Sequence, residues 1–549
     1  MASENRETTP TATIETAEGP VRGVVQDGIS TFRGIPYAAP PVGPLRWRAP
    51  APVTPWKGTV REASQNGPSS LQNEQMCEAV GGGHPGTMSE DCLYLNVWSP
   101  RLESGAKLPV MVWIHGGAFI IGAGGLPTYD GRPFASKGAV VVSFNYRLGC
   151  LGFFKYPALE AETPTGEGKV NNFSILDQIA ALEWVNRNIE KFGGDKDNVT
   201  IFGQSAGARS VLALFTSPLI TGRQAKGLPQ LFHKGIAQSV YRMKEAREDK
   251  AENRCEKLVS AVWQTREAVT AEGLRELSAE KLININQEVP LTPKQLQGTS
   301  NSPVAIVGDS VLTKNVFEAF ANGEAMKLPL IIGNTSDDVS VVFDGGLTPQ
   351  DMINLSGRFA ITLVKYYPDL PQEADKLDRA EIGRRVGRDG FFTEATNQIA
   401  HNHAAKGASA WQYYYDYTAE GLRSTVTKGT RHGDDVAFTM NTLDYAPIYA
   451  PPPASPPNTE KIVFTDADRA FAAKVADYWF QFALTGTPSS AGSPEWPQTT
   501  AEHSNTLMLG NVGATDKGEI TLNADFMKTH MPDFQAIGIS YDAAVALRP

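Results

Sequence analysis

Cysteine, long apolar runs and excess positive charge are all scarce in this 549-residue sequence. Four cysteines are too few for a disulfide-stabilised scaffold. The longest stretch without a charged residue, 108–129, contains Pro109 and five glycines, so it predicts a strand and a glycine-rich loop rather than a membrane span. Acidic residues outnumber basic ones by 60 to 50, which argues against a general nucleic-acid or anionic-membrane binder.

The composition is that of a globular protein with a large core. Apolar residues make up 41% of the chain and charged residues 20%, which excludes wholesale disorder. Residues 1–10 are polar and predict a flexible N-terminus without a signal peptide, in a cytoplasmic protein or in a secreted one whose signal was removed. No linker divides 11–549, so we expect a single domain with helical and loop insertions, either as a monomer or as a homodimer.

Short apolar runs predict the strands. Residues 110–114, 139–144 and 199–202 suit strands that are buried on both faces. Small strands are also expected near the N-terminus, and helical patterns follow the later strands. This alternation predicts an α/β fold with a mostly parallel central sheet, flanked by helices and preceded by small antiparallel strands. The expected N-terminal strands are 13–15, 21–26 and 30–35.

Three segments have helical spacing of apolar residues. The first follows Ser174 and Asp177, which resemble a capping box, and it ends at the glycine pair 193–194. The second covers 206–215, and the third covers 467–484. The third carries an aromatic face, which we interpret as core packing rather than as a cofactor site. Charged residues 244–285 also have a helical pattern, and 451–457 predicts a proline-rich surface loop.

Residues 203–207 read Gly-Gln-Ser-Ala-Gly, a G-x-S-x-G pattern. Alone the pattern is weak, but here it joins a predicted strand to a predicted helix, the context of a nucleophile elbow. A sharp turn there would raise the Ser205 hydroxyl above the sheet, and side chains larger than glycine at 203 and 207 would collide with neighbouring elements. The alternative is a glycine turn with a solvated serine.

A serine needs a base, and histidine is the usual one. In folds that carry a nucleophile elbow, the serine, the acid and the histidine follow one another in that order along the chain. Every histidine after Ser205 is therefore a candidate. His432 is favoured because it lies in a polar loop, 429–435, after a strand-like run at 411–417. His401 and His403 are two apart in a helical stretch and do not share a face, so a metal pair there is not expected. The remaining candidates are His233, His503 and His530.

The acid and the oxyanion donors are expected after other strands. Asp338 is the leading acid and Asp337 the second candidate, since both follow the strand-like run 328–333. Two adjacent acids could equally form a capped turn. The glycine loop at 115–119 follows the strand 110–114 and can bring backbone N–H groups close to a substrate oxygen. The expected oxyanion-hole donors are the N–H groups of Gly116, Gly117 and Ala206.

Over about residues 11–534 the sequence resembles the type-B carboxylesterase family. The segments that carry the resemblance are 32–37, 89–97, 115–119, 145–149, 192–195 and the Ser205 elbow. The resemblance implies the α/β-hydrolase fold and a serine ester hydrolase that acts on a small-molecule ester through an acyl-enzyme. By the same resemblance Ser205 is the nucleophile, His432 the base and Asp338 the acid. A disulfide between Cys77 and Cys92 is implied too, and no cofactor or metal is.

The sequence departs from the family pattern beside the nucleophile. Gln204 stands where the family usually has Glu, and Asp338 where it usually has Glu. Loss of a negative charge at Gln204 predicts better tolerance of anionic or neutral esters than of cationic ones. Arg209 could reinforce this preference, although a structural role is an alternative. Together with Phe119 and Tyr241, these residues are the candidates for the substrate pocket.

Two other functions stay open at this level. The same three groups could hydrolyse amides, carbamates or lactones, because the triad chemistry does not discriminate among these substrates and only the leaving-group pocket would. A non-catalytic adhesion protein on the same fold is the other alternative. It is disfavoured because relatives of that kind lack the nucleophile, and Ser205 is present here.

Overall fold

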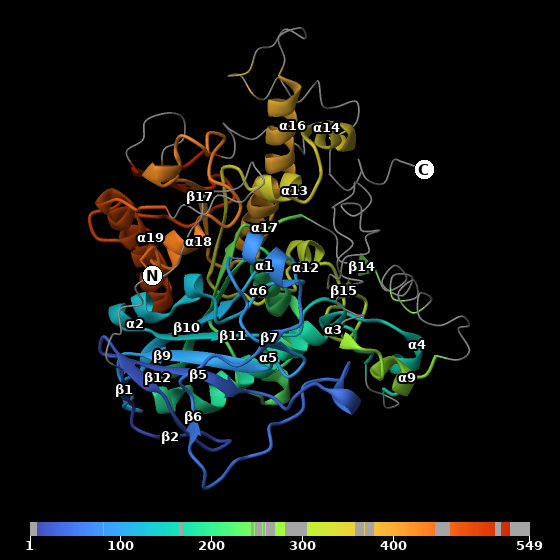
Figure 1. Ribbon diagram of the computed structural model, residues 1–549. Helices are drawn as coiled ribbons and strands as arrows, with labels where there is room; N and C mark the ends of the chain where they lie inside the picture. Colours follow the sequence, from blue (N-terminus) through green and yellow to red (C-terminus); the bar gives the residue numbers. More distant parts are fainter. Residues whose placement is uncertain are drawn as a thin grey trace.

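The computed structural model describes most of the chain (Figure 1). The described residues are 8–80, 82–163, 168–242, 246–247, 255, 259, 269–279, 305–356, 367, 370, 378–444, 462–510 and 518–526. Most of the charged segment 244–285, all of the proline-rich loop 451–457 and His530 lie outside them.

A twelve-stranded sheet forms the centre of the molecule, in the order β1-β4-β5-β9-β11-β10-β12-β13-β16-β17-β18-β19. The strands from β11 to β18 are parallel, and the pairs at both edges are antiparallel. The predicted mostly parallel sheet is therefore confirmed. In chain order the strands are β1 (Thr9–Pro10), β4 (Val24–Gln26), β5 (Ile29–Pro36), β9 (Tyr94–Ser99), β10 (Leu108–Ile114), β11 (Val140–Phe144), β12 (Gly194–Gln204), β13 (Lys234–Gln238), β16 (Leu330–Thr335), β17 (Ala410–Asp416), β18 (Thr506–Gly510) and β19 (Ile520–Asn523).

Smaller strands and short helices surround the sheet. The three-stranded sheet contains β2 (Ile14–Glu15), β3 (Pro20–Arg22) and β6 (Arg61–Glu62), and two-stranded sheets pair β7 (Ser69–Ser70) with β8 (Met88–Ser89) and β14 (Ala246–Arg247) with β15 (Ile306–Val307). Shorter helices include α1 (Glu74–Val80), α3 (Gly149–Gly152), α4 (Pro157–Glu160), α7 (Pro218–Thr221), α9 (Ala271–Arg275), α12 (Val316–Asn322), α13 (Ser340–Asp344), α14 (Pro349–Ser356) and α18 (Val436–Thr439). Thr9–Pro10 pair with β4, so part of the expected flexible N-terminus is ordered.

Helices bury both faces of the sheet, which explains the continuous apolar runs of its central strands. In β10, Val110, Val112 and Ile114 join a core cluster with residues of α5 (Phe173–Asn188) and α6 (Ala206–Thr216). The intervening Met111 and Trp113 belong to a second cluster, under α2 (Arg132–Lys137) and α19 (Asp466–Thr485). The aromatic face predicted for 467–484 is part of that second cluster, so its core role is confirmed.

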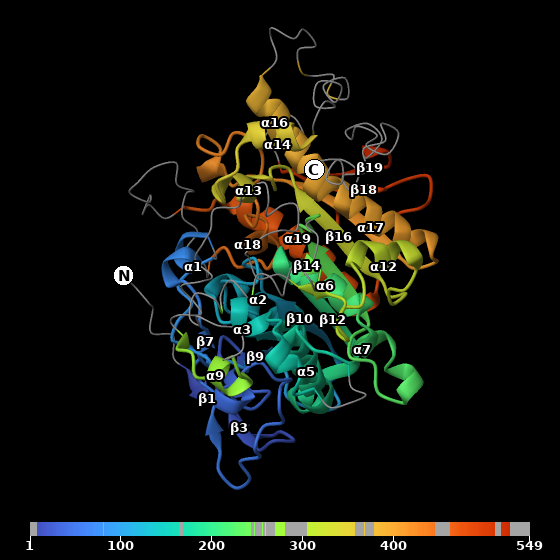
Figure 2. The ribbon, with the colours of Figure 1, turned by 90° about the vertical axis from the view of Figure 1, so that its right-hand side faces the viewer.

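One long helix crosses from the sheet to the periphery. It consists of α16 (Arg379–Arg388), a π-helical turn (Asp389–Thr393) and α17 (Glu394–Ala405). The α17 part packs on β16 and β17, whereas α16 packs against α14. Figures 1 and 2 show α13, α14 and α16 together at one end of the molecule, beyond the carboxyl ends of the parallel strands.

The predicted capping box at Ser174 and Asp177 is wrong. Helix α5 begins at Phe173, and no side chain caps it. The Ser174 hydroxyl donates to the carbonyl of Arg147 at 2.7 Å, and the Asp177 carboxylate accepts from the Arg147 guanidinium at 2.6 and 2.8 Å. Arg147, in the segment after β11, thus binds both side chains that the local pattern assigned to the helix terminus, and its contact with Asp177 is a buried ion pair.

The expected disulfide is also wrong, because Cys77 and Cys92 are both free and buried. Each thiol belongs to a different apolar environment. Cys77 packs with Ile120 and Ile121, whereas Cys92 lies in the main core. Burial raises the pKa of the Cys77 thiol to about 11, so it is held as a thiol at neutral pH.

Candidate active site

The G-x-S-x-G motif forms the sharp turn between β12 and α6. Ser205 has φ 57° and ψ −121°, a conformation that a non-glycine residue rarely adopts. The flanking glycines are required by close packing, because a Cβ at Gly207 would lie 2.0 Å from the carbonyl oxygen of Ile114, and one at Gly203 would lie 2.6 Å from it. The predicted turn and the reason for its small residues are therefore confirmed.

Substitution of Gly207 by alanine is expected to destabilise the protein by about 3 kcal/mol, because the added methyl group has no space between α6 and β10. Chemical denaturation of the variant measures this effect. Gly105→Ala is the matched control, since nothing lies within 4 Å of a Cβ there, and its change should stay within about 0.5 kcal/mol. Equal stability of the two variants contradicts the packing argument.

The loops after β16 and β17 bring Asp338 and His432 together. These strands are parallel neighbours, and their pairing continues into the loops, where the Asp337 N–H donates to the Thr430 carbonyl at 2.8 Å. The His432 Nδ1 atom lies 2.7 Å from Asp338 Oδ1. The Asp338 carboxylate is fully buried, and its other oxygen accepts from the Thr335 N–H at 2.8 Å.

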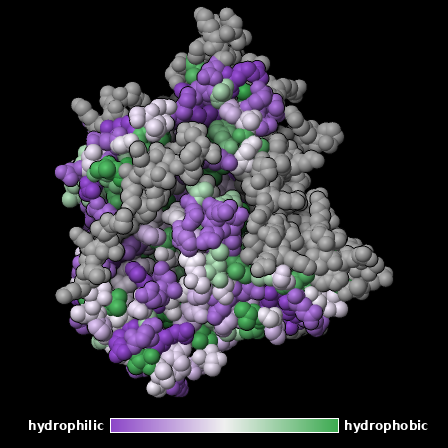
Figure 3. Space-filling view, in the orientation of Figure 1, coloured by the Kyte–Doolittle hydropathy of each residue, from purple (hydrophilic) through white to green (hydrophobic). Residues whose placement is uncertain are grey.

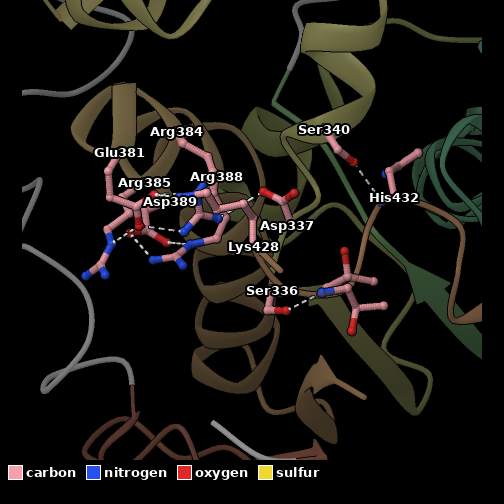
Figure 4. A network of polar contacts seen from close by, with 12 residues as sticks. Ser336, Asp337, Ser340, Glu381, Arg384, Arg385, Arg388, Asp389, Lys428 and His432 are labelled. Carbon is pink, nitrogen blue, oxygen red and sulfur yellow. Dashed lines mark hydrogen bonds and ion pairs between the residues drawn. The ribbon is translucent and has the colours of Figure 1, made fainter. Parts of the chain in front are cut away.

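The neighbouring Asp337 has a different partner. Its carboxylate accepts from the Arg384 guanidinium of α16 at 2.9 Å, within a network that includes Glu381, Arg385 and the Arg388–Asp389 pair (Figure 4). Burial raises the pKa of Asp337 to about 6, although Arg384 opposes the shift. Asp337 and Asp338 thus point to different sides of one turn, and only Asp338 pairs with His432.

His432 is held on three sides. Its backbone N–H donates to Ser340 Oγ at 3.0 Å (Figure 4), and the ring of Phe392 lies 5.6 Å from the imidazole, centroid to centroid. Phe392 belongs to the π-helical turn, a kind of element often found at functional sites. Neither contact has a signal in the sequence, because Ser340 and Phe392 reach His432 through the tertiary fold.

The third contact of His432 is with Gln204. Its amide Nε2 lies 3.1 Å from His432 Nε2, the ring nitrogen that faces away from Asp338. Within the described part of the chain, no hydrogen bond joins that nitrogen to the Ser205 hydroxyl. Since Gln204 is covalently bonded to Ser205, the histidine still stands beside the residue on which the elbow is centred. The imidazole thus lies between the Asp338 carboxylate and the residue that precedes Ser205.

The loop after β10 lies against the elbow. A Cβ at Gly116 would lie 3.2 Å from the Cβ of Ser205, so the Gly116 backbone is next to the serine side chain. The next three residues, Gly117, Ala118 and Phe119, all have positive φ. Ala206 opens α6, where the first N–H groups have no carbonyl partner within the helix. Backbone N–H groups from both segments can therefore face an oxygen bound at Ser205.

His115 anchors this glycine loop from the core. It is buried, stacks on Tyr146 with ring centroids 4.3 Å apart, and its Nδ1 lies 2.8 Å from the Gly116 carbonyl oxygen. Burial lowers the pKa of His115 to about 4, so the ring is neutral near pH 7.

The pocket candidates occupy different environments. Tyr241 packs on Phe392, with ring centroids 6.4 Å apart. Arg209, one helical turn beyond Ser205, lies over the rings of Tyr241 and Phe317 and donates to the Tyr241 carbonyl at 3.3 Å. Phe119 is 3% exposed and packs edge-on against Phe153, with ring centroids 5.1 Å apart, so it supports the glycine loop from the core.

Two further acids, Asp434 and Asp435, lie on the histidine loop, and no sequence motif marks them. Burial raises the pKa of Asp434 to about 6 and that of Asp435 to about 7, and the nearby Asp338 charge adds to the shift of Asp435. Asp435 accepts from Gln238 Nε2 at 3.2 Å. Their position two and three residues after His432 was the only signal available.

Three of the other candidate histidines have separate partners. His233 Nδ1 accepts from the Val199 N–H at 3.1 Å, His403 Nε2 lies 2.7 Å from the Leu328 carbonyl, and exposed His503 pairs with Asp525. Among the described residues, one group has metal-ligand spacing. It consists of Glu74, Glu78 and His84, all exposed, and His84 already forms an ion pair with Glu74 at 2.7 Å. No helix in the described ranges has both the length and the apolarity that crossing a membrane requires.

Comparison with known proteins identifies esterases as relatives of this chain. The sequence profile described as "Carboxylesterase family" matches residues 10–527. The chain is 33% identical to the fumonisin B1 esterase of Sphingopyxis macrogoltabida, over 89% of this chain and 85% of that enzyme. It is also 33% identical to the para-nitrobenzyl esterase of Bacillus subtilis (93% and 96%) and 31% identical to the human cocaine esterase (86% and 82%).

Solved structures give the same result for the fold. A PNB esterase structure superposes with a TM-score of 0.74 at 28% identity, covering 97% of this chain and 99% of that one. A carboxylesterase of Geobacillus stearothermophilus superposes with a TM-score of 0.72 at 29% identity, covering 97% and 100%. The expected α/β-hydrolase architecture is confirmed, and the chain belongs to the carboxylesterase family.

Proposed function

We propose that this protein hydrolyses small-molecule carboxylic esters through an acyl-enzyme on Ser205. In this proposal His432 is the general base and acid, and Asp338 orients it. The oxyanion is bound by the N–H groups of Gly116, Gly117 and Ala206. The observation that carries the proposal is the 2.7 Å contact of buried Asp338 with His432, on a loop that also reaches the strained Ser205 elbow.

The first half of the reaction transfers the acyl group to the enzyme. Ser205 Oγ attacks the ester carbonyl carbon while His432 Nε2 takes the hydroxyl proton, and the carbonyl oxygen becomes an oxyanion held by the backbone N–H groups. Collapse of this intermediate breaks the bond to the alcohol oxygen, which leaves with the proton from His432. The Asp338 carboxylate keeps the proton of Nδ1 in place throughout.

The second half returns the enzyme to its starting state. A water molecule gives one proton to His432 Nε2 and attacks the acyl carbon, and the oxyanion forms again at the same donors. The bond to Ser205 Oγ then breaks, and Oγ recovers its proton from His432. The products are one carboxylic acid and one alcohol for each ester and water consumed.

A panel of neutral esters, amides, carbamates and lactones tests the proposed function, together with a fluorophosphonate probe that labels an activated serine. We expect labelling at Ser205 and turnover of esters well above that of matched amides. Absence of both labelling and turnover would support a non-catalytic member of the fold. Labelling without ester turnover would point to one of the other acyl substrates.

We further propose that the site accepts anionic or neutral esters better than cationic ones. Gln204 brings no charge to the elbow, where the family pattern usually has a glutamate. Arg209 lies on α6, four residues after Ser205, and Arg242 follows β13, the strand beside β12. Both guanidinium groups lie over the ring of Phe317, at 5.1 and 5.3 Å. Their field supports binding of a negatively charged substrate group.

Gln204→Glu is expected to lower the ratio of kcat/KM for a hemisuccinate ester to that for a matched neutral ester by about tenfold, because it places a negative charge beside the substrate. The ratio is measured at one pH and ionic strength. Gln350→Glu is the control, since Gln350 is exposed on α14 and the change in net charge is the same. An unchanged ratio in Gln204→Glu contradicts the proposed preference.

A further inference from the structure

The contact between Gln204 and His432 joins two nitrogen atoms, so one must donate and the other accept. The Asp338 carboxylate can only accept, and it lies 2.7 Å from His432 Nδ1. Nδ1 therefore carries the proton of the neutral ring, and Nε2 presents its lone pair. It follows that the Gln204 amide N–H donates to the lone pair that the base uses in catalysis.

The Gln204 side chain is closely fitted in this position. It is 7% exposed, and it ends β12 in register with Gln238 of the neighbouring strand. A Cβ at Gly116 would lie 3.1 Å from Gln204 Oε1, and one at Gly433 would lie 3.7 Å from Gln204 Nε2. Glycines on both sides thus leave room for the amide between the loop after β10 and the histidine loop.

We propose that Gln204 is a positioning residue that holds the neutral imidazole of His432 in the resting enzyme and gives way to the Ser205 hydroxyl when substrate binds. The proposal rests on the proposed function, because it assigns Nε2 of His432 as the base. A single lone pair cannot accept fully from two donors, so the Gln204 N–H and the Ser205 O–H compete for it.

The Gln204 amide can form a hydrogen bond with the His432 ring in both of its protonation states. When Ser205 transfers its proton, Nε2 becomes a donor, and the Gln204 N–H no longer has an acceptor there. Rotation of the amide presents Oε1, which can accept from Nε2–H until the alcohol oxygen takes the proton. A glutamate carboxylate has no N–H, so it stabilises only the protonated ring. Gln204 therefore favours the neutral, catalytically competent base relative to glutamate.

The other groups that face His432 are the same whether residue 204 is glutamine or glutamate. Asp338 contacts Nδ1, and Asp434 and Asp435 lie on the histidine's own loop. Ser340 and Phe392, from α13 and the π-helical turn, are uncharged. Gln204→Glu thus adds one charge while the other groups that face His432, Asp434 and Asp435 included, are the same in the wild type and the variant.

The test is the pH dependence of kcat/KM for a neutral ester, with the second-order rate of fluorophosphonate labelling as an independent measure. Because the neutral imidazole is the active form, Gln204→Glu should move the midpoint of the acid limb up by about one pH unit, an about tenfold loss of rate on that limb. Gln204→Met, which has similar length and no N–H donor, should move it in the same direction by less.

Controls separate this role from a structural one. Gln350→Glu should leave the profile unchanged, and thermal melting shows whether each variant is folded. Superimposable profiles for all variants overturn the proposal, as does a shift in Gln204→Glu alone, since that result would need only the charge and not the N–H donor. A wild-type protein without turnover or labelling would instead refute the proposed function.

Discussion

Ser205→Ala is expected to abolish fluorophosphonate labelling and to lower kcat for esters by about 10⁴-fold or more. Without the hydroxyl there is no atom to form the acyl-enzyme, and only the oxyanion donors and substrate binding remain. Labelling followed by intact-mass measurement, together with turnover of a chromogenic ester, measures both effects. A variant that keeps the wild-type rate would show that another residue attacks the ester.

The matched control for this prediction is Ser210→Ala. Ser210 lies on the same helix, is fully buried, and its hydroxyl donates to the Ala206 carbonyl at 3.0 Å. The same hydroxyl accepts from the buried Gln178 Nε2 at 3.0 Å, so its removal should cost about 1–3 kcal/mol of stability and leave labelling intact. The pair therefore separates loss of a reacting atom from loss of packing or hydrogen bonding in α6.

Local patterns were sufficient to predict the elements that carry the site. The spacing of apolar residues predicted β10 and α6 to within two residues of their observed ends, whereas β12 begins five residues before the predicted 199–202. The elbow motif required small residues, and the packing against Ile114 explains them. Each of these features depends on neighbours in the chain or on adjacent strands. They are therefore visible in the residues themselves.

Predictions failed where a distant partner changed the role of a local pattern. Ser174 and Asp177 have the spacing of a capping box, but Arg147 takes both side chains. Cys77 and Cys92 are close in sequence, but each packs in a separate apolar cluster. Spacing along the chain does not contain the positions of such partners.

Some contacts of His432 could be predicted from local sequence, and others depend on distant parts of the chain. The sequence placed the histidine on a loop and Asp338 after a strand, and the parallel pairing of β16 with β17 brings the two together. The amide of Gln204 and the ring of Phe392 also reach the imidazole. Gln204 was singled out only for its missing charge, and the π-helical turn that carries Phe392 has no sequence signature.

The two adjacent acids give the second large prediction. Asp338→Asn should lower kcat by about 10⁴-fold with little change in KM, because an asparagine cannot hold the proton on Nδ1 or stabilise the imidazolium as a carboxylate does. Kinetics with a neutral ester measure the effect. A reduction of less than about tenfold would exclude Asp338 as the orienting acid.

Asp337→Asn is the matched comparison, since it makes the same chemical change one residue away. Its expected cost is about 1–3 kcal/mol of folding stability, because Arg384 loses a buried carboxylate partner and keeps, in the described part of the chain, its ion pair with Glu381. Its kcat should change by a few-fold at most, since the Asp337 side chain belongs to the α16 network and not to the imidazole. A larger loss of kcat in Asp337→Asn than in Asp338→Asn would reverse the assignment. Opposite profiles, with stability lost in one variant and turnover lost in the other, are what two acids on two sides of one turn require.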